Sequence, residues 1–234
     1  MKILALDSSA VVGSVALCED TRMVAHYTLN TGNTHSQTLL PMIESALGCA
    51  EWEIDDLDLI AVSNGPGSFT GVRIGVATVK GLAFGKNIPC AGVSTLEALA
   101  YNLRYYNGII CPVMNARRAQ VYNALFSCEN GVLTRLCPDR AISIAELDEE
   151  LACMEQPVYL VGDGYDITIE GFEKTIALPV PEELRVQSGY SVAMCGLAAY
   201  ERGEATDDTA LAVVYLRPSQ AERERNERLA NQNV

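Results

Sequence analysis

A glycine-rich stretch from Ser63 to Gly75 has residue types and a spacing that could bind a ligand. It reads SNGPGSFTGVRIG and links an apolar strand pattern to an apolar helix pattern. Free N–H groups at a helix start, reached closely through glycine, favour an anion such as phosphate. The spacing fits neither standard phosphate motif, because Gly67 and Gly71 enclose three residues and no Lys-Ser/Thr follows. The pattern therefore favours a tight turn that lets a helix pack closely on a sheet.

The histidines, serines and cysteines of the sequence do not form the patterns typical of a metal site or a hydrolase. His26 and His35 are nine residues apart, and no His-x-x-x-His or Cys/His set accompanies them. Ser68 would have to recruit one of these two histidines as its base. The eight cysteines contain no Cys-x-x-Cys pair, so we expect reduced core residues and neither a zinc site nor a disulfide framework. We expect no metal and no cofactor.

Composition narrows the classes of partner. The 234 residues carry a formal charge of -13, and the pI is near 4.6, which argues against direct binding of nucleic acid. If the protein acts on RNA, we expect a partner to hold the RNA. The sequence opens on a strand pattern without a signal-peptide succession, and no apolar run has membrane-spanning length. We expect a cytoplasmic protein that does not contact a membrane.

Hydrophobic periodicity predicts two similar units in tandem. The first has strands at 2–7, 12–18 and 22–30, a helix at 34–50, a strand at 57–63, a helix at 70–85, a strand at 88–93 and a short helix from 94. The second has strands at 109–114, 121–127 and 132–141, a helix at 144–154, a strand at 158–161 and a helix at 191–203. The sequence therefore predicts an α/β protein with an antiparallel meander extended by parallel strands in each unit.

Two β-β-β-α-β-α units are the signature of the actin, Hsp70 and sugar-kinase superfold (ASKHA), in which nucleotide binds between the halves. We expect a first actin-like domain at 1–104 and a reduced second one at 105–215.

The charged stretch from 220 to 229 predicts a surface helix, and we expect residues 216–234 to pack back on the first domain. Helix ends are also indicated: Thr34-x-x-Gln37 resembles a capping box, and Pro41 should kink its helix or mark the true start.

Similarity to that superfold also points to a vestigial nucleotide site. Asp7 and Ser8 follow the first strand, where the superfold places a metal-phosphate Asp and a hydroxyl turn. The equivalent hairpin of the second half has Asn115 where a carboxylate would oppose Asp7, and an amide is neither a base nor a good Mg²⁺ ligand. Gly162 begins a Gly-Asp-Gly turn that fits either a remnant nucleotide turn or a plain β-turn.

The helices at 35–50 and 70–85 have wider apolar arcs than docking on one sheet requires. Glycines at 71, 75, 81 and 85 cost about 1 kcal/mol each in a helix, so something must approach closely enough to use the missing side chains. The two helices either bury each other or together form a protein-protein surface, and the pattern favours the surface. The predicted contact residues are Leu39, Leu40, Ile43 and Leu47 on the first helix and Gly71, Val72, Gly75, Val76 and Val79 on the second.

Nearly end to end, the motifs resemble the TsaB family, also called YeaZ. The matching strings are DSS at 7–9, HSQTLLP at 35–41, GPGSFTGVRIG at 65–75, NARRAQVY at 115–122 and YLR at 215–217. The related catalytic family, TsaD, has a metal-binding His-x-x-x-His, whereas Thr95 and Leu99 stand at those positions here. Asn115 and Gln120 replace acidic residues that are common in TsaB, which further weakens nucleotide or metal chemistry.

The resemblance implies a subunit that is not an enzyme by itself. TsaB-like proteins pair with a TsaD-like catalytic subunit through the two first-domain helices. With a TsaE-like ATPase they assist formation of N6-threonylcarbamoyladenosine in tRNA. The resemblance also implies that tRNA is met only through the complex, and that a homodimer can form through the same helices.

Two other functions remain open at this point. Asp7 and the duplicated fold are compatible with an ATP-dependent phosphotransferase of the sugar-kinase type. A metalloprotease would need a metal site.

Overall fold

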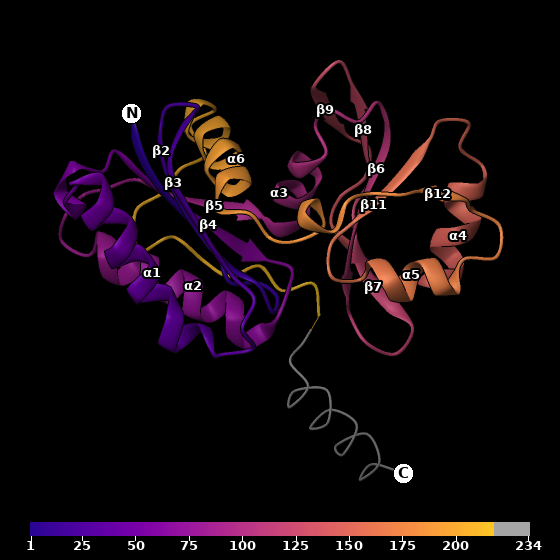
Figure 1. The fold of residues 1–234 in the computed structure, drawn as a ribbon, viewed down its shortest axis with the longest axis horizontal. Helices are drawn as coiled ribbons and strands as arrows, with labels where there is room; N and C mark the ends of the chain where they lie inside the picture. The colour runs from indigo at the N-terminus through magenta and orange to yellow at the C-terminus, as the bar shows by residue number, and fades with distance from the viewer. Residues whose placement is uncertain (218–234) are drawn as a thin grey trace, which may run out of the picture.

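The first half of the protein is built on a five-stranded mixed sheet in the order β3-β2-β1-β4-β5 (Figure 1). A computed structural model describes residues 1–217. The strands are β1 (Lys2–Asp7), β2 (Gly13–Glu19), β3 (Arg22–Leu29), β4 (Leu59–Gly65) and β5 (Cys90–Ser94). The first three pair antiparallel, and β4 and β5 extend β1 in parallel, which confirms the predicted arrangement.

Helices cover both faces of this sheet, as the strand alternation requires. Leu4 and Leu6 of β1 point into a core with α1 (His35–Ala50) and α2 (Phe69–Ala83). Ile3 and Ala5 point the other way, into a core with α6 (Gly189–Glu201). The short helix η1 (Ile54–Asp56) precedes β4, and α3 (Thr95–Asn102) follows β5.

The ends of the first two helices differ in part from the sequence prediction. α1 begins at His35, but the side chain of Thr34 makes no capping hydrogen bond, so the predicted capping box does not form. Pro41 lies inside α1 and does not mark its start. α2 is capped by Ser68, whose hydroxyl accepts the N–H of Gly71, and it ends at Ala83. Gly85, which was predicted inside this helix, lies beyond it.

The second half is built on a seven-stranded sheet in the order β10-β7-β6-β11-β12, with β8 paired to β6 and β9 paired to β8. Its elements are β6 (Gly108–Asn115), β7 (Gln120–Asn123), β8 (Phe126–Glu129), β9 (Val132–Arg135), β10 (Arg140–Ser143), α4 (Ile144–Ala152), β11 (Val158–Val161), α5 (Tyr165–Gly171), β12 (Ala177–Leu178) and η2 (Glu182–Leu184).

The predicted strands at 121–127 and 132–141 are therefore wrong, because each is two strands. Buried Asn123 explains the first break: its side-chain amide donates to the carbonyls of Pro112 and Ala124, and the chain leaves β7 there.

The chain returns to the first half after η2. α6 contacts β1, β2, β4 and β5, and Thr206 forms an isolated bridge with Cys90 at the free edge of β5. The division into 1–104 and 105–215 stays a proposal, and this packing favours moving α6 to the first unit. The predicted helix at 220–229 and the proposed packing of 216–234 fall almost wholly outside the described residues.

Five of the eight cysteines are buried, and none forms a disulfide. None of the helices within residues 1–217 combines the length and the hydrophobicity needed to cross a bilayer.

Candidate functional site

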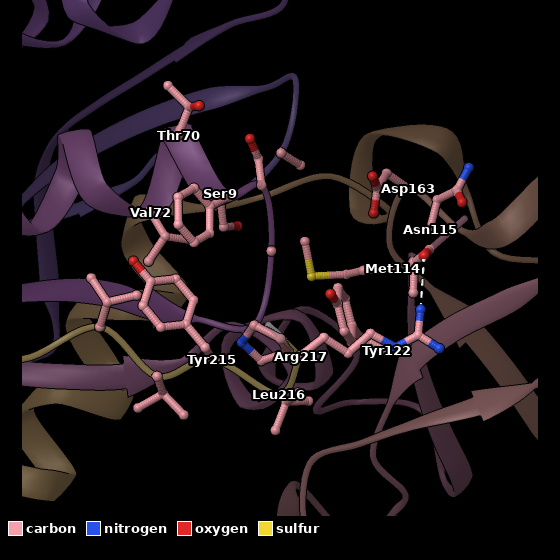
Figure 2. A pocket seen from close by; sticks show the side chains of 18 of the residues that line it. Ser9, Thr70, Val72, Met114, Asn115, Tyr122, Asp163, Tyr215, Leu216 and Arg217 are labelled. Atoms are coloured by element: carbon pink, nitrogen blue, oxygen red, sulfur yellow. Dashed lines mark hydrogen bonds between the residues drawn. The ribbon is translucent and has the colours of Figure 1, made fainter. Parts of the chain in front are cut away.

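A cavity of about 410 Å³ separates the two halves and brings together most of the motifs found in the sequence (Figure 2). Its walls come from the turn after β1, the start of α2, the β6–β7 hairpin, the turn after β11 and residues 213–217. Figure 2 shows Ser9, Thr70 and Tyr215 on one side and Asn115 and Asp163 on the other.

Asp7 lies beneath this cavity and is fully engaged by its own chain. Its carboxylate accepts hydrogen bonds from the N–H of Ser9 at 2.8 Å, the hydroxyl of Ser9 at 2.6 Å and the hydroxyl of Ser63. Burial raises the pKa of this carboxyl, and the Ser63 and Ser9 donors oppose that rise. Only 1% of Asp7 is exposed, so the side chain organises the turn and does not present a ligand to the cavity.

Ser8 fastens α2 to the end of β1. Its hydroxyl donates to the carbonyl of Gly71 at 2.9 Å, and Ser8 is completely buried. A Cβ added at Gly71 would lie 2.0 Å from the Ser8 carbonyl oxygen, and one at Gly75 would lie 2.6 Å from the Ser8 hydroxyl. A Cβ at Gly67 would lie 2.5 Å from the carbonyl oxygen of Ser9. The prediction that this turn lets a helix pack closely on a sheet is confirmed.

Both histidines make hydrogen-bond contacts with other residues of the first half. The ring Nε2 of His35 donates to the carbonyl of Ala10 at 2.6 Å, and that of His26 lies 2.9 Å from the Ser14 hydroxyl. The Ser68 hydroxyl caps α2 instead of meeting a base. Within residues 1–217, no group of three or more His, Cys, Asp or Glu side chains is placed to hold a metal ion.

Asp163 is the residue that sequence reasoning missed. It lies in the turn between β11 and α5 and faces the cavity on the same side as Asn115, the residue that was expected to oppose Asp7 (Figure 2). Burial, together with the charge of Asp7, raises the pKa of Asp163 to about 6, although the N–H groups of Asp163 and Asn115 oppose the shift. Solvent reaches the side chain through the cavity. A second carboxylate therefore does face the first half, but from β11 and not from β6.

The sequence carried a partial signal for Asp163, its Gly-Asp-Gly turn, but strand pairing decides where that turn lies. The Gly162-Asp163-Gly164 turn directly follows a strand that is parallel to β6, and the carboxyl ends of parallel strands meet at one edge of a sheet. Gly162 itself is structural: its φ is 114°, and a Cβ there would lie 2.2 Å from the carbonyl oxygen of Val113.

Residues 209–217 run along the polar edge of α2 to the cavity. Lys80 donates to the carbonyl of Thr209, and Arg73 donates to the hydroxyl of Tyr215 at 2.5 Å. The ring of Tyr215 stacks on Phe69 with centroids 4.9 Å apart, and Arg217 then reaches the second half by donating to Ala116. The Tyr-Leu-Arg motif thus closes one rim of the cavity.

The predicted partner surface is mostly inside the chain. Leu39, Ile43, Leu47, Val72, Val76 and Val79 belong to the core beneath α1 and α2, and each is at most 8% exposed. Gly71 and Gly75 face Ser8, so their missing side chains serve the chain's own packing. Only Leu40, at 47% exposed, remains available to a partner.

The outer face of the same helices carries Leu40 and six residues outside the predicted set. The exposed positions include Leu40, Pro41, Ser45 and Gly48 on α1 and Arg73, Ala77 and Gly81 on α2. Within the described part of the chain, a Cβ at Gly48 or Gly81 would meet nothing within 4 Å. We call these seven residues the α1/α2 face.

Comparison with known proteins decides the family. A family model described as TsaD, tRNA N6-adenosine threonylcarbamoyltransferase, matches residues 29–222. The tRNA threonylcarbamoyladenosine biosynthesis protein TsaB of Bacillus subtilis is 40% identical over 162 residues, which cover 69% of this chain and 71% of that protein. This chain belongs to the TsaB (YeaZ) family. YeaZ from Pseudomonas aeruginosa superimposes with a TM-score of 0.77 at 26% identity, over 92% of this chain and 99% of that one.

Family membership confirms the resemblance read from the motifs and the ASKHA-type fold. It also places the chain among proteins of threonylcarbamoyladenosine tRNA modification. Thr95 and Leu99, which were expected to stand in place of two metal-binding histidines, are both buried here.

Proposed function

We propose that this TsaB-family chain is a non-catalytic subunit of tRNA N6-threonylcarbamoyladenosine synthesis that binds a TsaD-like catalytic subunit through the α1/α2 face. The observation that carries the proposal is the composition of that face. Helical glycine is unfavourable by about 1 kcal/mol relative to alanine, yet a Cβ at Gly48 or Gly81 would have no atom of residues 1–217 within 4 Å. A second backbone approaching closely would use the space that they leave.

The engagement of the cavity residues supports a non-catalytic role. Asp7 accepts two hydrogen bonds from Ser9 of its own turn and one from Ser63 of β4, and it is 1% exposed, so it offers no open position to a metal or a phosphate. Asn115 uses its side-chain oxygen to accept the N–H of Arg117 at 2.8 Å. Among the described residues that line the cavity, Asp163 supplies the one carboxyl group, and no base is paired with it there.

The other partners follow from the same assignment. A TsaE-like ATPase would join the assembly, and two copies of this chain would compete for the α1/α2 face by forming a homodimer. The net charge of -13 supports a contact with tRNA that runs through the complex.

The test compares two matched pairs of substitutions. Leu40→Glu with Ala77→Glu adds two charges to the α1/α2 face, and Ile176→Glu with Ala152→Glu adds the same charges to exposed positions of the second half. Burying uncompensated charge costs about 3 kcal/mol, so the first pair should weaken binding to the TsaD-like subunit roughly 100-fold. The second pair should bind normally.

Affinity would be measured by calorimetry with the purified TsaD-like subunit, and tRNA modification would be measured in the reconstituted complex. Equal binding by both double variants would remove the α1/α2 face from the proposal. Substitutions at Gly75 or Val79 are unsuitable, because these positions are buried and would test folding instead.

Asp163 gives the phosphotransferase alternative one specific point of support, because it supplies the second carboxylate that the β6–β7 hairpin lacks. Calorimetry with Mg-ATP distinguishes the two functions. Tight binding that is abolished by Asp163→Asn would favour the phosphotransferase, and the proposed function expects no such binding.

A further inference from the structure

We infer that the two halves of this chain form one rigid body, with α3 as their shared core element, so that the cavity keeps its width when a ligand is present. The argument starts from the apolar face of α3. Leu96, Leu99 and Leu103 are at most 1% exposed, and they belong to a core whose other members come largely from the second sheet. The buried second-half members of that core are Ile110, Met114, Ala124, Phe126, Cys128, Val161 and Val180.

The opposite side of α3 packs on the first half. α3 contacts β4, β5 and α6 there and β6 in the second half, and Figure 1 shows it between the two sheets. A Cβ at Gly162 would lie 3.2 Å from the Leu99 side chain, which places the helix directly against the turn after β11. Moving the two halves apart would therefore expose the buried leucines of α3 to water. The halves are not joined by a linker that could bend without losing such contacts.

A polar network fixes the first end of α3 to the second half. Arg135 of β9 donates to Glu97 at 3.1 Å and to Asp139 at 2.5 Å. Asp139 also accepts the hydroxyl of Ser94, the capping residue of α3, at 2.6 Å. The Arg135 guanidinium lies over the ring of Phe126, 4.6 Å from its centroid. This contact within the second half fixes the position of the guanidinium.

Asn102 joins the other end of α3 to residues 184–191, the segment that leads from the second half back into α6. Its side-chain amide donates to the carbonyls of Leu184 at 3.0 Å and Val186 at 2.8 Å, and its oxygen accepts the hydroxyl of Ser191 at 2.6 Å. Both connections between the halves are thereby tied to one helix. With the Arg217 contact to Ala116 on the cavity rim, the two halves are held together at three separate places.

Distances between spin labels in the full chain test this inference. One label goes on Met23→Cys in β3, which is 52% exposed, and the other on exposed Cys153 after α4. Cys49→Ser and Cys137→Ser remove the other accessible thiols, and the serine at 137 keeps an acceptor for the N–H of Leu125. Dilution with unlabelled chain removes distances between copies.

A single narrow distance that Mg-ATP does not shift is the expected result. Two distances, or a shift on adding Mg-ATP, would overturn the inference. Arg135→Ala should broaden the distribution, whereas Arg202→Ala, which removes an exposed ion pair with Glu204, should not. Equal widths in these two variants would overturn the role given to Arg135. The widths of the distance distributions do not depend on partner binding, so they leave the proposed function to its own test. A shift with Mg-ATP would count against the proposed function as well.

Discussion

Two glycines of α2 should respond in opposite directions to the same substitution. Gly71→Ala places a Cβ 2.0 Å from the carbonyl oxygen of Ser8, a backbone atom at the end of β1 that cannot rotate away. Overpacking of this kind costs about 3 kcal/mol, and the better helix propensity of alanine returns about 1 kcal/mol. We therefore expect Gly71→Ala to lower the free energy of unfolding by about 2 kcal/mol.

Gly81→Ala is the matched control in the same helix. Its new Cβ meets no atom of the described residues within 4 Å, so only the helix propensity changes, and the free energy of unfolding should rise by about 1 kcal/mol. Urea unfolding of the isolated chain, followed through the fluorescence of its single tryptophan, Trp52, measures both variants. Equal stabilities for Gly71→Ala and Gly81→Ala would refute the close seating of α2 on Ser8.

Two further predictions concern carboxylates of the second half. Asp148 is 4% exposed and accepts the N–H groups of residues 173, 174 and 175, so Asp148→Ala should cost about 3 kcal/mol in urea unfolding; Glu149→Ala, which removes only a surface ion pair with Lys174, should cost less than about 1 kcal/mol. Because the pKa of Asp163 is raised to about 6, the folded state binds this proton more tightly than the unfolded state, and the free energy of unfolding should fall as the pH rises from about 4 to 6. Since solvent reaches the side chain, we expect a fall of about 1 kcal/mol that Asp163→Asn abolishes, measured from urea midpoints across that pH range.

The first half could be predicted closely because its strands and helices have clean periods. β1 alternates between two cores, and the helical spacing of α1 carries Leu39, Ile43 and Leu47 to one side. The second half has shorter strands whose breaks depend on tertiary hydrogen bonds, as at Asn123, and an apolar sequence gives no sign of such a break.

The candidate surface shows a different limit of sequence reasoning. A helical wheel identifies an apolar arc but not the part of it that the chain itself covers. Gly71 and Gly75 looked available for a partner, yet Ser8, more than sixty positions earlier, occupies their space. Asp163 was missed for a related reason, since only the parallel pairing of β11 with β6 brings its turn to the cavity.

The return of α6 to the first sheet has a consequence for how the chain is made. Ala16, Ala61 and Ala91 lie in the core that α6 completes, and the edge of β5 pairs with Thr206. A nascent chain that has emerged only as far as the second half leaves that face of the first sheet without its cover. The first half should therefore finish folding only after α6 has been synthesised, and the ribosome or a chaperone would meet an exposed alanine-rich sheet until then.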